Sequence, residues 1–133
     1  MNTIKDLLKA LPDMEHSFEL AEVPGDVTGI RYSGNFRYRI PTNKQKALAE
    51  RKRAELTGGL DDQMSTSVVQ FIYKIAYLRA TLIEYPEWWA KADYGYDLHD
   101  VSIVDEVYNK VILFENDWMS KVWGKKEIDG VAS

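Results

Sequence analysis

The stretch 62–85 constrains the fold of this chain more than any other part of the sequence. Apolar side chains recur there at helical spacing, and only three side chains after Asp62 carry a charge. An apolar arc this broad is typical of a helix that contacts other elements on two sides. We therefore predict a central helix over 62–85, stopped by Pro86. Its apolar positions are Met64, Val68, Phe71, Ile72, Ile75, Leu78 and Leu82, widened by Val69, Ala76 and Ile83.

Residues 43–56 predict a second helix, this one on the surface. They consist mainly of strong helix formers and lie between a Pro-Thr start signal and a Gly-Gly stop signal. Their apolar face is thin, so the helix has little to bury. Residues 3–11 form a shorter amphipathic pattern that Pro12 ends.

A last helix is predicted over 102–122. Apolar side chains recur there at helical spacing, with either Phe114 or Glu115 in the stripe. We expect the chain beyond it, 124–133, to be a flexible tail.

The segment 17–40 has a different pattern. Two turn signals rich in Gly, Pro, Asn and Asp divide it, and Phe36, Tyr38 and Ile40 then alternate with Arg37 and Arg39. This alternation is typical of a strand with one buried face. Together with the helices, it predicts a mainly α fold: one helical domain, 1–123, with a short N-terminal β-hairpin-like element.

Composition limits where the protein works. The chain has no cysteine, which excludes disulfides and thiolate metal sites and suits a reducing compartment. No uncharged apolar run approaches the roughly 18 residues that a bilayer crossing needs. The first six residues also lack the apolar stretch of a signal peptide. We therefore expect a cytoplasmic protein without membrane contact.

Charge is distributed unevenly along the chain. The segment from Arg31 to Arg53 holds eight bases and one acid, a charge of +7, so the rest carries −11 for a net charge of −4. Such a segment favours an oppositely charged partner, and other copies of the chain can supply one. An alternative is a small nucleic-acid-binding regulator in which Tyr32, Phe36 and Tyr38 stack on bases between the arginines. A strand with one solvated face explains the same residues.

The sequence offers little for catalysis. No cysteine is present, the two histidines lie far apart, and the common nucleophile, phosphate-loop and zinc-protease motifs are missing. The best candidate for a metal site is the cluster Asp93, Asp97, His99 and Asp100. Capping of the last helix by Asp100 and a surface position for His99 explain these residues without a metal. We predict no catalytic, cofactor-binding or metal site, and a protein that is not an enzyme.

Adjacent Trp88 and Trp89 interrupt the helices after Pro86. They are either an exposed aromatic anchor for a partner or a loop folded onto the core. Because neighbouring side chains point in different directions, we expect at least one to be partly exposed. The residues that we single out for protein interaction are Arg37, Arg39, Arg51, Arg53, Trp88 and Trp89.

The order of these signals along 35–118 is distinctive as a whole. A strand ending in Ile40-Pro41-Thr42 is followed by a basic helix, Leu56-Thr57-Gly58-Gly59, a long apolar helix, the Trp-Trp break and a last helix that contains glutamate. This order resembles the tail assembly chaperones of long-tailed, lambda-like bacteriophages.

The resemblance implies a function in the cytoplasm of an infected bacterium. Members of this family bind the tape measure protein, help to recruit tail tube protein around it, associate with themselves in a spiral and are absent from the finished virion. It implies no catalytic residues and no nucleic-acid partner. In the family a longer form that recruits the tail tube often arises by a −1 ribosomal frameshift near the last codons. The Trp codon, with GGA for Gly124 and a lysine codon after it, makes the slippery heptamer G GGA AAA or G GGA AAG.

Overall fold

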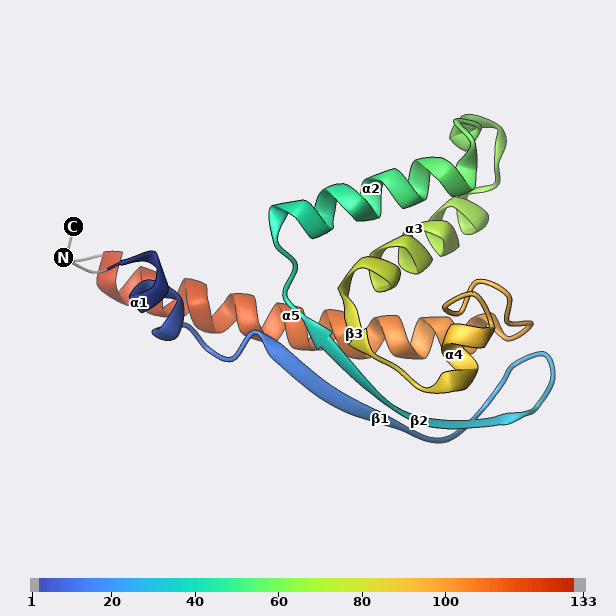
Figure 1. Ribbon diagram of the computed structural model, residues 1–133, viewed down its shortest axis with the longest axis horizontal. Coiled ribbons are helices and arrows are strands. Elements are labelled where there is room, and N and C mark those ends of the chain that lie inside the picture. The colour runs from blue at the N-terminus through green and yellow to red at the C-terminus, as the bar shows by residue number, and fades with distance from the viewer. Residues whose placement is uncertain (1–2, 131–133) are drawn as a thin grey trace.

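The computed structural model describes residues 3–130, and the side chains of 3–124, as a mixed α/β fold (Figure 1). Within this range the chain is 57 % helix and 18 % strand, with five helices and a three-stranded antiparallel sheet. The prediction of a mainly α fold is therefore wrong. Its β element is a long hairpin, and a third strand comes from the middle of the chain.

The sheet has the strand order β1 (Glu15–Pro24), β2 (Arg31–Arg39), β3 (Leu82–Glu84). A bulge between Leu20 and Val23 interrupts the β1–β2 register. Along β2, Phe36 and Tyr38 are buried while their neighbours are more exposed. The period-2 strand predicted from the sequence is thus confirmed, and its apolar face forms part of the core.

The central helix is shorter than predicted. Helix α3 spans Thr66–Thr81, and the chain then becomes strand β3 instead of remaining helical to residue 85. Pairing with β2 explains the change, because it satisfies backbone groups of β2 and buries Leu82. Pro86 also disfavours helical geometry in the residue before it.

Helices α2 (Asn43–Thr57) and α3 lie side by side as an arm above α5 (Val101–Gly130) (Figure 1). A capping box between Thr42 and Gln45 starts α2, and Gly58 ends it with a left-handed φ of 60°. These local signals explain why the observed helix differs by one residue from the predicted 43–56. Only Thr57 of α2 is buried, in line with its thin apolar face.

Helix α5 spans Val101–Gly130, 30 residues or about 45 Å. It exceeds the predicted 102–122, because the Lys-Lys-Glu-Ile sequence after Gly124 continues the helix. The predicted flexible tail over 124–133 is therefore helical as far as Gly130, and 131–133 lie outside the described residues. None of the helices in the described range is both long and apolar enough to cross a bilayer.

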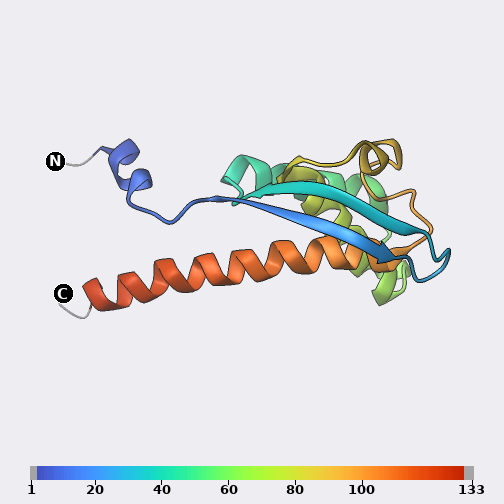
Figure 2. The same ribbon diagram turned by 90° about the horizontal axis from the view of Figure 1, so that it is seen from below.

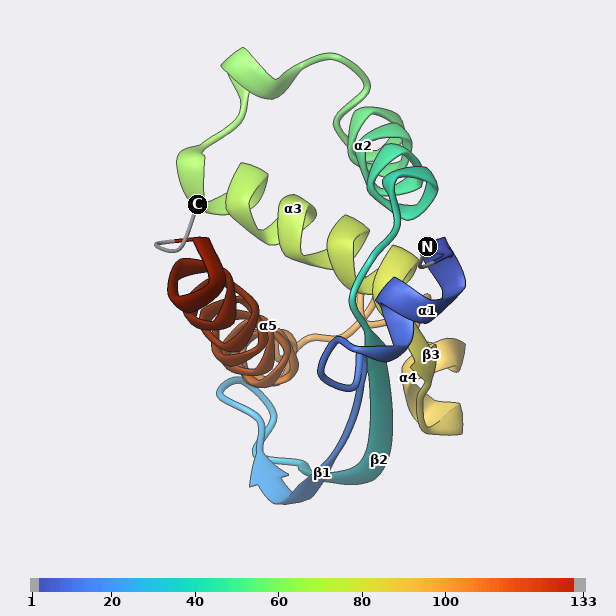
Figure 3. The ribbon, with the colours of Figure 1, turned by 90° about the vertical axis from the view of Figure 1, so that its left-hand side faces the viewer.

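The core lies where α5 and α3 meet the inner face of the sheet, as the view along the molecule shows (Figure 3). Helix α4 (Glu87–Lys91) closes it from the side, and α1 (Ile4–Lys9) lies beyond the end of the sheet (Figure 2). The buried core residues are Leu20, Phe36, Tyr38, Ile75, Leu78, Leu82, Trp89, Ile103, Val104, Val107 and Val111.

Candidate functional site

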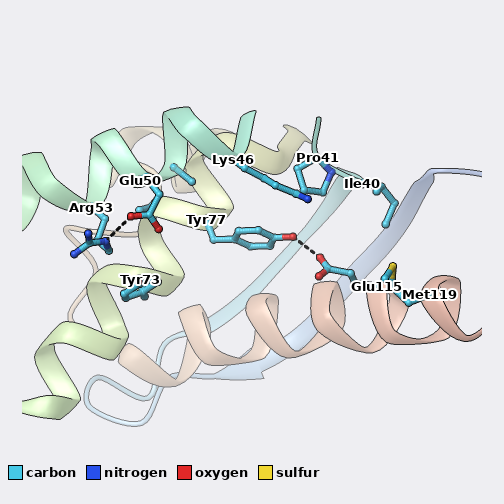
Figure 4. Close-up of a pocket in the computed structure, with 11 residues that line it drawn as sticks. Ile40, Pro41, Lys46, Glu50, Arg53, Tyr73, Tyr77, Glu115 and Met119 are labelled. Carbon is cyan, nitrogen blue, oxygen red and sulfur yellow. Dashed lines mark hydrogen bonds and ion pairs between the residues drawn. The ribbon is translucent and has the colours of Figure 1, made fainter. Parts of the chain in front are cut away.

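A groove opens between the α2–α3 arm and the middle of α5 (Figure 4). Its volume is about 400 Å³, within the range of sites that bind small molecules or side chains. Because α2 buries almost nothing, it covers α3 without closing onto α5. The lining residues are Ile40, Pro41, Lys46, Ala49, Glu50, Arg53, Tyr73, Ala76, Tyr77, Glu115 and Met119.

The floor of the groove holds a carboxylate, Glu115 of α5. Tyr38 donates a hydrogen bond to Glu115 Oε2 at 2.6 Å, and Tyr77 donates to the same oxygen. Burial, followed by the bonds to Glu115, raises the pKa of both phenols well above their ordinary value. Both hydroxyls therefore stay protonated as donors, and they fix the carboxylate at the junction of β2, α3 and α5.

The opposite end of the groove is a network of ion pairs around Arg53. Arg53 Nε donates to Glu50 Oε2 at 3.1 Å, a second guanidinium nitrogen pairs with Asp61, and the guanidinium lies 5.1 Å from the centre of the Tyr73 ring. Arg53, predicted to interact with proteins, thus lines the groove with its charge already compensated. Lys46 lies on the same side, exposed, and forms no ion pair with a described residue.

The other predicted arginines lie elsewhere. Arg37 Nε donates to Glu15 Oε1 at 2.7 Å and Arg37 also pairs with Glu84, while Arg39 pairs with Glu15. All these groups belong to the outer face of the sheet. Arg51 lines a separate, open depression on the α2–α3 arm, so the structure does not bring the four arginines together.

Ion pairs compensate half of the basic segment. Of its eight bases, four form ion pairs with described acids: Arg37, Arg39, Lys52 and Arg53. The residues proposed to stack on nucleic-acid bases are equally committed, because Phe36 and Tyr38 are buried and the Tyr32 hydroxyl binds Asp100. Of the three proposed stacking residues, Phe36 and Tyr38 are thus in the core, while Tyr32 is half-buried.

The two tryptophans fold back onto the core. Trp89 is only 1 % exposed and meets Phe36 edge-on, with ring centroids 5.4 Å apart. For Trp89 this burial favours the second alternative from the sequence, a loop folded onto the core, over an exposed anchor. Trp88 is half-buried, and its indole N–H donates to the Ser33 carbonyl at 2.8 Å.

Asp100 neither caps α5 with its side chain nor belongs to a metal cluster. Its buried carboxylate accepts hydrogen bonds from the backbone of Val27 and Thr28, the Thr28 hydroxyl and the Tyr32 hydroxyl, at 2.6–2.8 Å. Burial alone would raise the pKa of Asp100, but these hydrogen bonds hold it well below its ordinary value. No group of three or more described acidic or histidine side chains is arranged to bind a metal ion.

Sequence reasoning did not identify Tyr77, Glu115 or Met119 as site residues. One signal was present, because Glu115 is a charged residue that competes with Phe114 for a place in the apolar stripe of 102–122. Tyr77 and Met119 look like ordinary helical residues until the three helices are assembled.

The groove is thus mainly apolar, and the carboxylate in its floor, Glu115, forms no ion pair with a described residue. Such a surface is suited to holding a side chain or a helix face. Comparisons with models of protein families, with curated proteins and with solved structures find no match for this chain.

Proposed function

We propose that this protein works by binding other proteins, as a tail assembly chaperone of a long-tailed bacteriophage. The observation that carries the proposal is the open groove between α2, α3 and α5. Its client is a helical segment of the tape measure protein, which the order of signals along 35–118 suggests. The protein uses no cofactor or metal in this function.

The groove suits the physical problem that such a client poses. A long helix with an apolar stripe has no partner for that stripe before the tail tube forms, so it needs a cover that can be removed. The groove offers Tyr73, Tyr77 and Met119 to an apolar helix face. Its modest size favours reversible binding, because interfaces well below about 1,200 Å² are typically weak.

The rest of the assignment belongs to the same proposal. The protein acts in the cytoplasm of the infected bacterium, associates with itself, and reaches the tail tube protein through a longer, frameshifted form. It makes no use of nucleic acid or of a membrane.

Co-expression tests the proposal. A helical fragment of the tape measure protein encoded near this gene is produced with and without the chaperone, and its soluble fraction is measured. We expect the chaperone to raise that fraction and to co-purify with the fragment. Met119→Glu, which places a charge in the groove, should weaken co-purification at least tenfold.

Leu113→Glu is the matched control. Leu113 lies on the same helix, is 70 % exposed and does not line the groove, so this variant should retain the fragment. A fragment that never co-purifies, or one lost equally from both variants, contradicts the proposed site.

A further inference from the structure

Helix α1 is folded but buries none of its own residues. Ile4, Leu7 and Leu8 are 77 %, 54 % and 51 % exposed. A helix of six residues is marginal in water without packing against another surface. Figure 2 shows it beyond the end of the sheet and separated from α5. An apolar helix face in this position requires a partner.

The groove complements α1 in size. An engineered cavity that holds one benzene-sized group measures roughly 150 Å³. At about 400 Å³ the groove therefore has room for two side chains the size of leucine, such as Leu7 and Leu8.

Lysines on α1 and a carboxylate in the groove can form an ion pair, while Lys46 in the groove lining carries the same charge as those lysines. Lys5 and Lys9 lie one helical turn apart, on one flank of the apolar face. Within the described residues, neither lysine forms an ion pair, and neither does Glu115 in the groove floor. A lysine that follows the leucines into the groove meets the one carboxylate there that lacks a cation.

We propose that α1 of one copy of this chain docks into the groove of a second copy. The contact is heterologous, because it joins two different surfaces, and repetition of it builds a chain of copies. It uses the groove of the proposed function and in that sense rests on it, but it does not require the client to be a tape measure protein.

The connection between α1 and β1 is fixed with α1 outside its own groove. The Pro12 carbonyl accepts a hydrogen bond from the Trp118 indole at 3.1 Å, and the Met14 carbonyl accepts one from the Ile40 N–H at 2.8 Å. Two points of the short linker are thereby fixed. They hold α1 near Glu15 and Arg39, with which it lines a shallow depression that shares no lining residue with the groove.

Sedimentation equilibrium of the full chain with complementary variants tests this inference. Leu7→Asp with Leu8→Asp, the docking variant, destroys the apolar face of α1 and leaves the groove intact. Met119→Glu, the groove variant, places a charge on the apolar lining of the groove and leaves α1 intact. Both sites are exposed, so neither change should affect folding, which circular dichroism verifies.

We expect the wild-type chain to associate as its concentration rises and each variant alone to associate at least tenfold more weakly. An equimolar mixture of the two should form a one-to-one dimer, because one supplies the helix and the other the groove. Leu113→Glu should associate like the wild type. Glu115→Gln should weaken association by up to about fivefold and reduce its salt dependence.

Two results overturn the inference. One is a mixture of the two variants that stays monomeric while the wild type associates. The other is a wild-type chain that stays monomeric at high concentration. The inference is overturned in the same way if, in addition, a peptide of residues 1–14 binds the docking variant and not the wild type, because α1 of the wild type would then fill the groove of its own chain.

The same variants separate this inference from the proposed function. The docking variant keeps its groove and should bind the tape measure fragment at least as well as the wild type. If it binds the fragment but never pairs with the groove variant, only the α1 contact is refuted. If the pair forms but no variant binds the fragment, only the chaperone assignment is refuted.

Discussion

Replacing Trp89 by alanine should destabilise this protein more than any change at its neighbour Trp88. Trp89 lies in the core against Phe36, and its ring also closes on Gly95, where an added Cβ would lie 2.5 Å from an indole carbon. The indole therefore has no free space around it, and its removal leaves a cavity that cannot collapse easily.

The expected loss can be estimated from this burial. Truncating a buried tryptophan to alanine costs about 3–5 kcal/mol in transfer and cavity terms. That loss is a large part of the free energy of unfolding of a typical domain, which is about 5–15 kcal/mol. The melting temperature should fall by about 10–20 °C. Trp88→Ala should cost only about 1–2 kcal/mol, because its half-buried indole loses one neutral hydrogen bond and part of its packing.

Urea unfolding followed by far-ultraviolet circular dichroism measures both losses, provided that the slope of the transition stays constant. Trp89→Phe keeps the comparison measurable if the alanine variant does not fold, because it retains most of the buried volume. Equal losses for Trp88→Ala and Trp89→Ala, or a loss below about 1 kcal/mol for Trp89→Ala, would falsify the division into one core and one half-exposed indole.

Three further predictions concern other parts of the chain. Because folding lowers the pKa of Asp100, its carboxylate stabilises the fold fully above about pH 5, and this contribution is lost as the pH falls below about 4. The urea midpoints of the wild type and Asp100→Asn should therefore converge in acid. A difference between these midpoints that stays constant down to about pH 3 contradicts the assignment. We expect no salt-sensitive retention of the protein on double-stranded DNA, since half of the basic segment is paired; retention that is lost on reversing the charges of Arg51 and Arg53 would revive the nucleic-acid alternative. In the gene, we expect GGA at Gly124 with an open −1 frame beyond it, and sequencing that finds another glycine codon ends the frameshift proposal.

The parts of the fold that sequence reasoning predicted well are those with local causes. Thr42 and Gly58 bound α2 by interactions within a few residues, and the alternation around Arg37 and Arg39 reports one strand with one buried face. Such signals depend on spacing alone, so they can be recognised before any tertiary contact is known.

The errors arose where distant segments decide the structure. The change from α3 to β3 at Leu82 depends on β2, more than forty residues earlier, and an apolar run is compatible with either helix or strand. The side chain of Asp100 likewise turns away from its own helix to bind Val27 and Thr28. Both choices follow from partners that spacing along the chain does not reveal.

The charge pattern of the sequence showed where basic residues gather but not whether the fold leaves them free of ion pairs. The +7 segment suggested a surface for an opposite charge, yet Arg37 and Arg39 are occupied by Glu15 on the neighbouring strand. A run of bases predicts a binding surface only to the extent that the fold leaves the bases unpaired. The unpaired charges that bear on association are instead Lys5, Lys9 and Glu115, which no run of like charges marks.

The thin apolar face of α2 links the sequence most directly to the proposed function. A helix with a full apolar stripe in this position would pack onto both α3 and α5 and fill the space between them. Because α2 buries only Thr57, it rests mainly on α3, and Tyr77 and Glu115 remain accessible from the groove. Substitutions that enlarge the apolar face of α2, such as Lys46→Leu with Glu50→Leu, should therefore let α2 pack onto α5 and fill the groove. Such variants should bind both the client and α1 of another copy more weakly. A weak helix face is in this sense the feature that keeps the binding surface open.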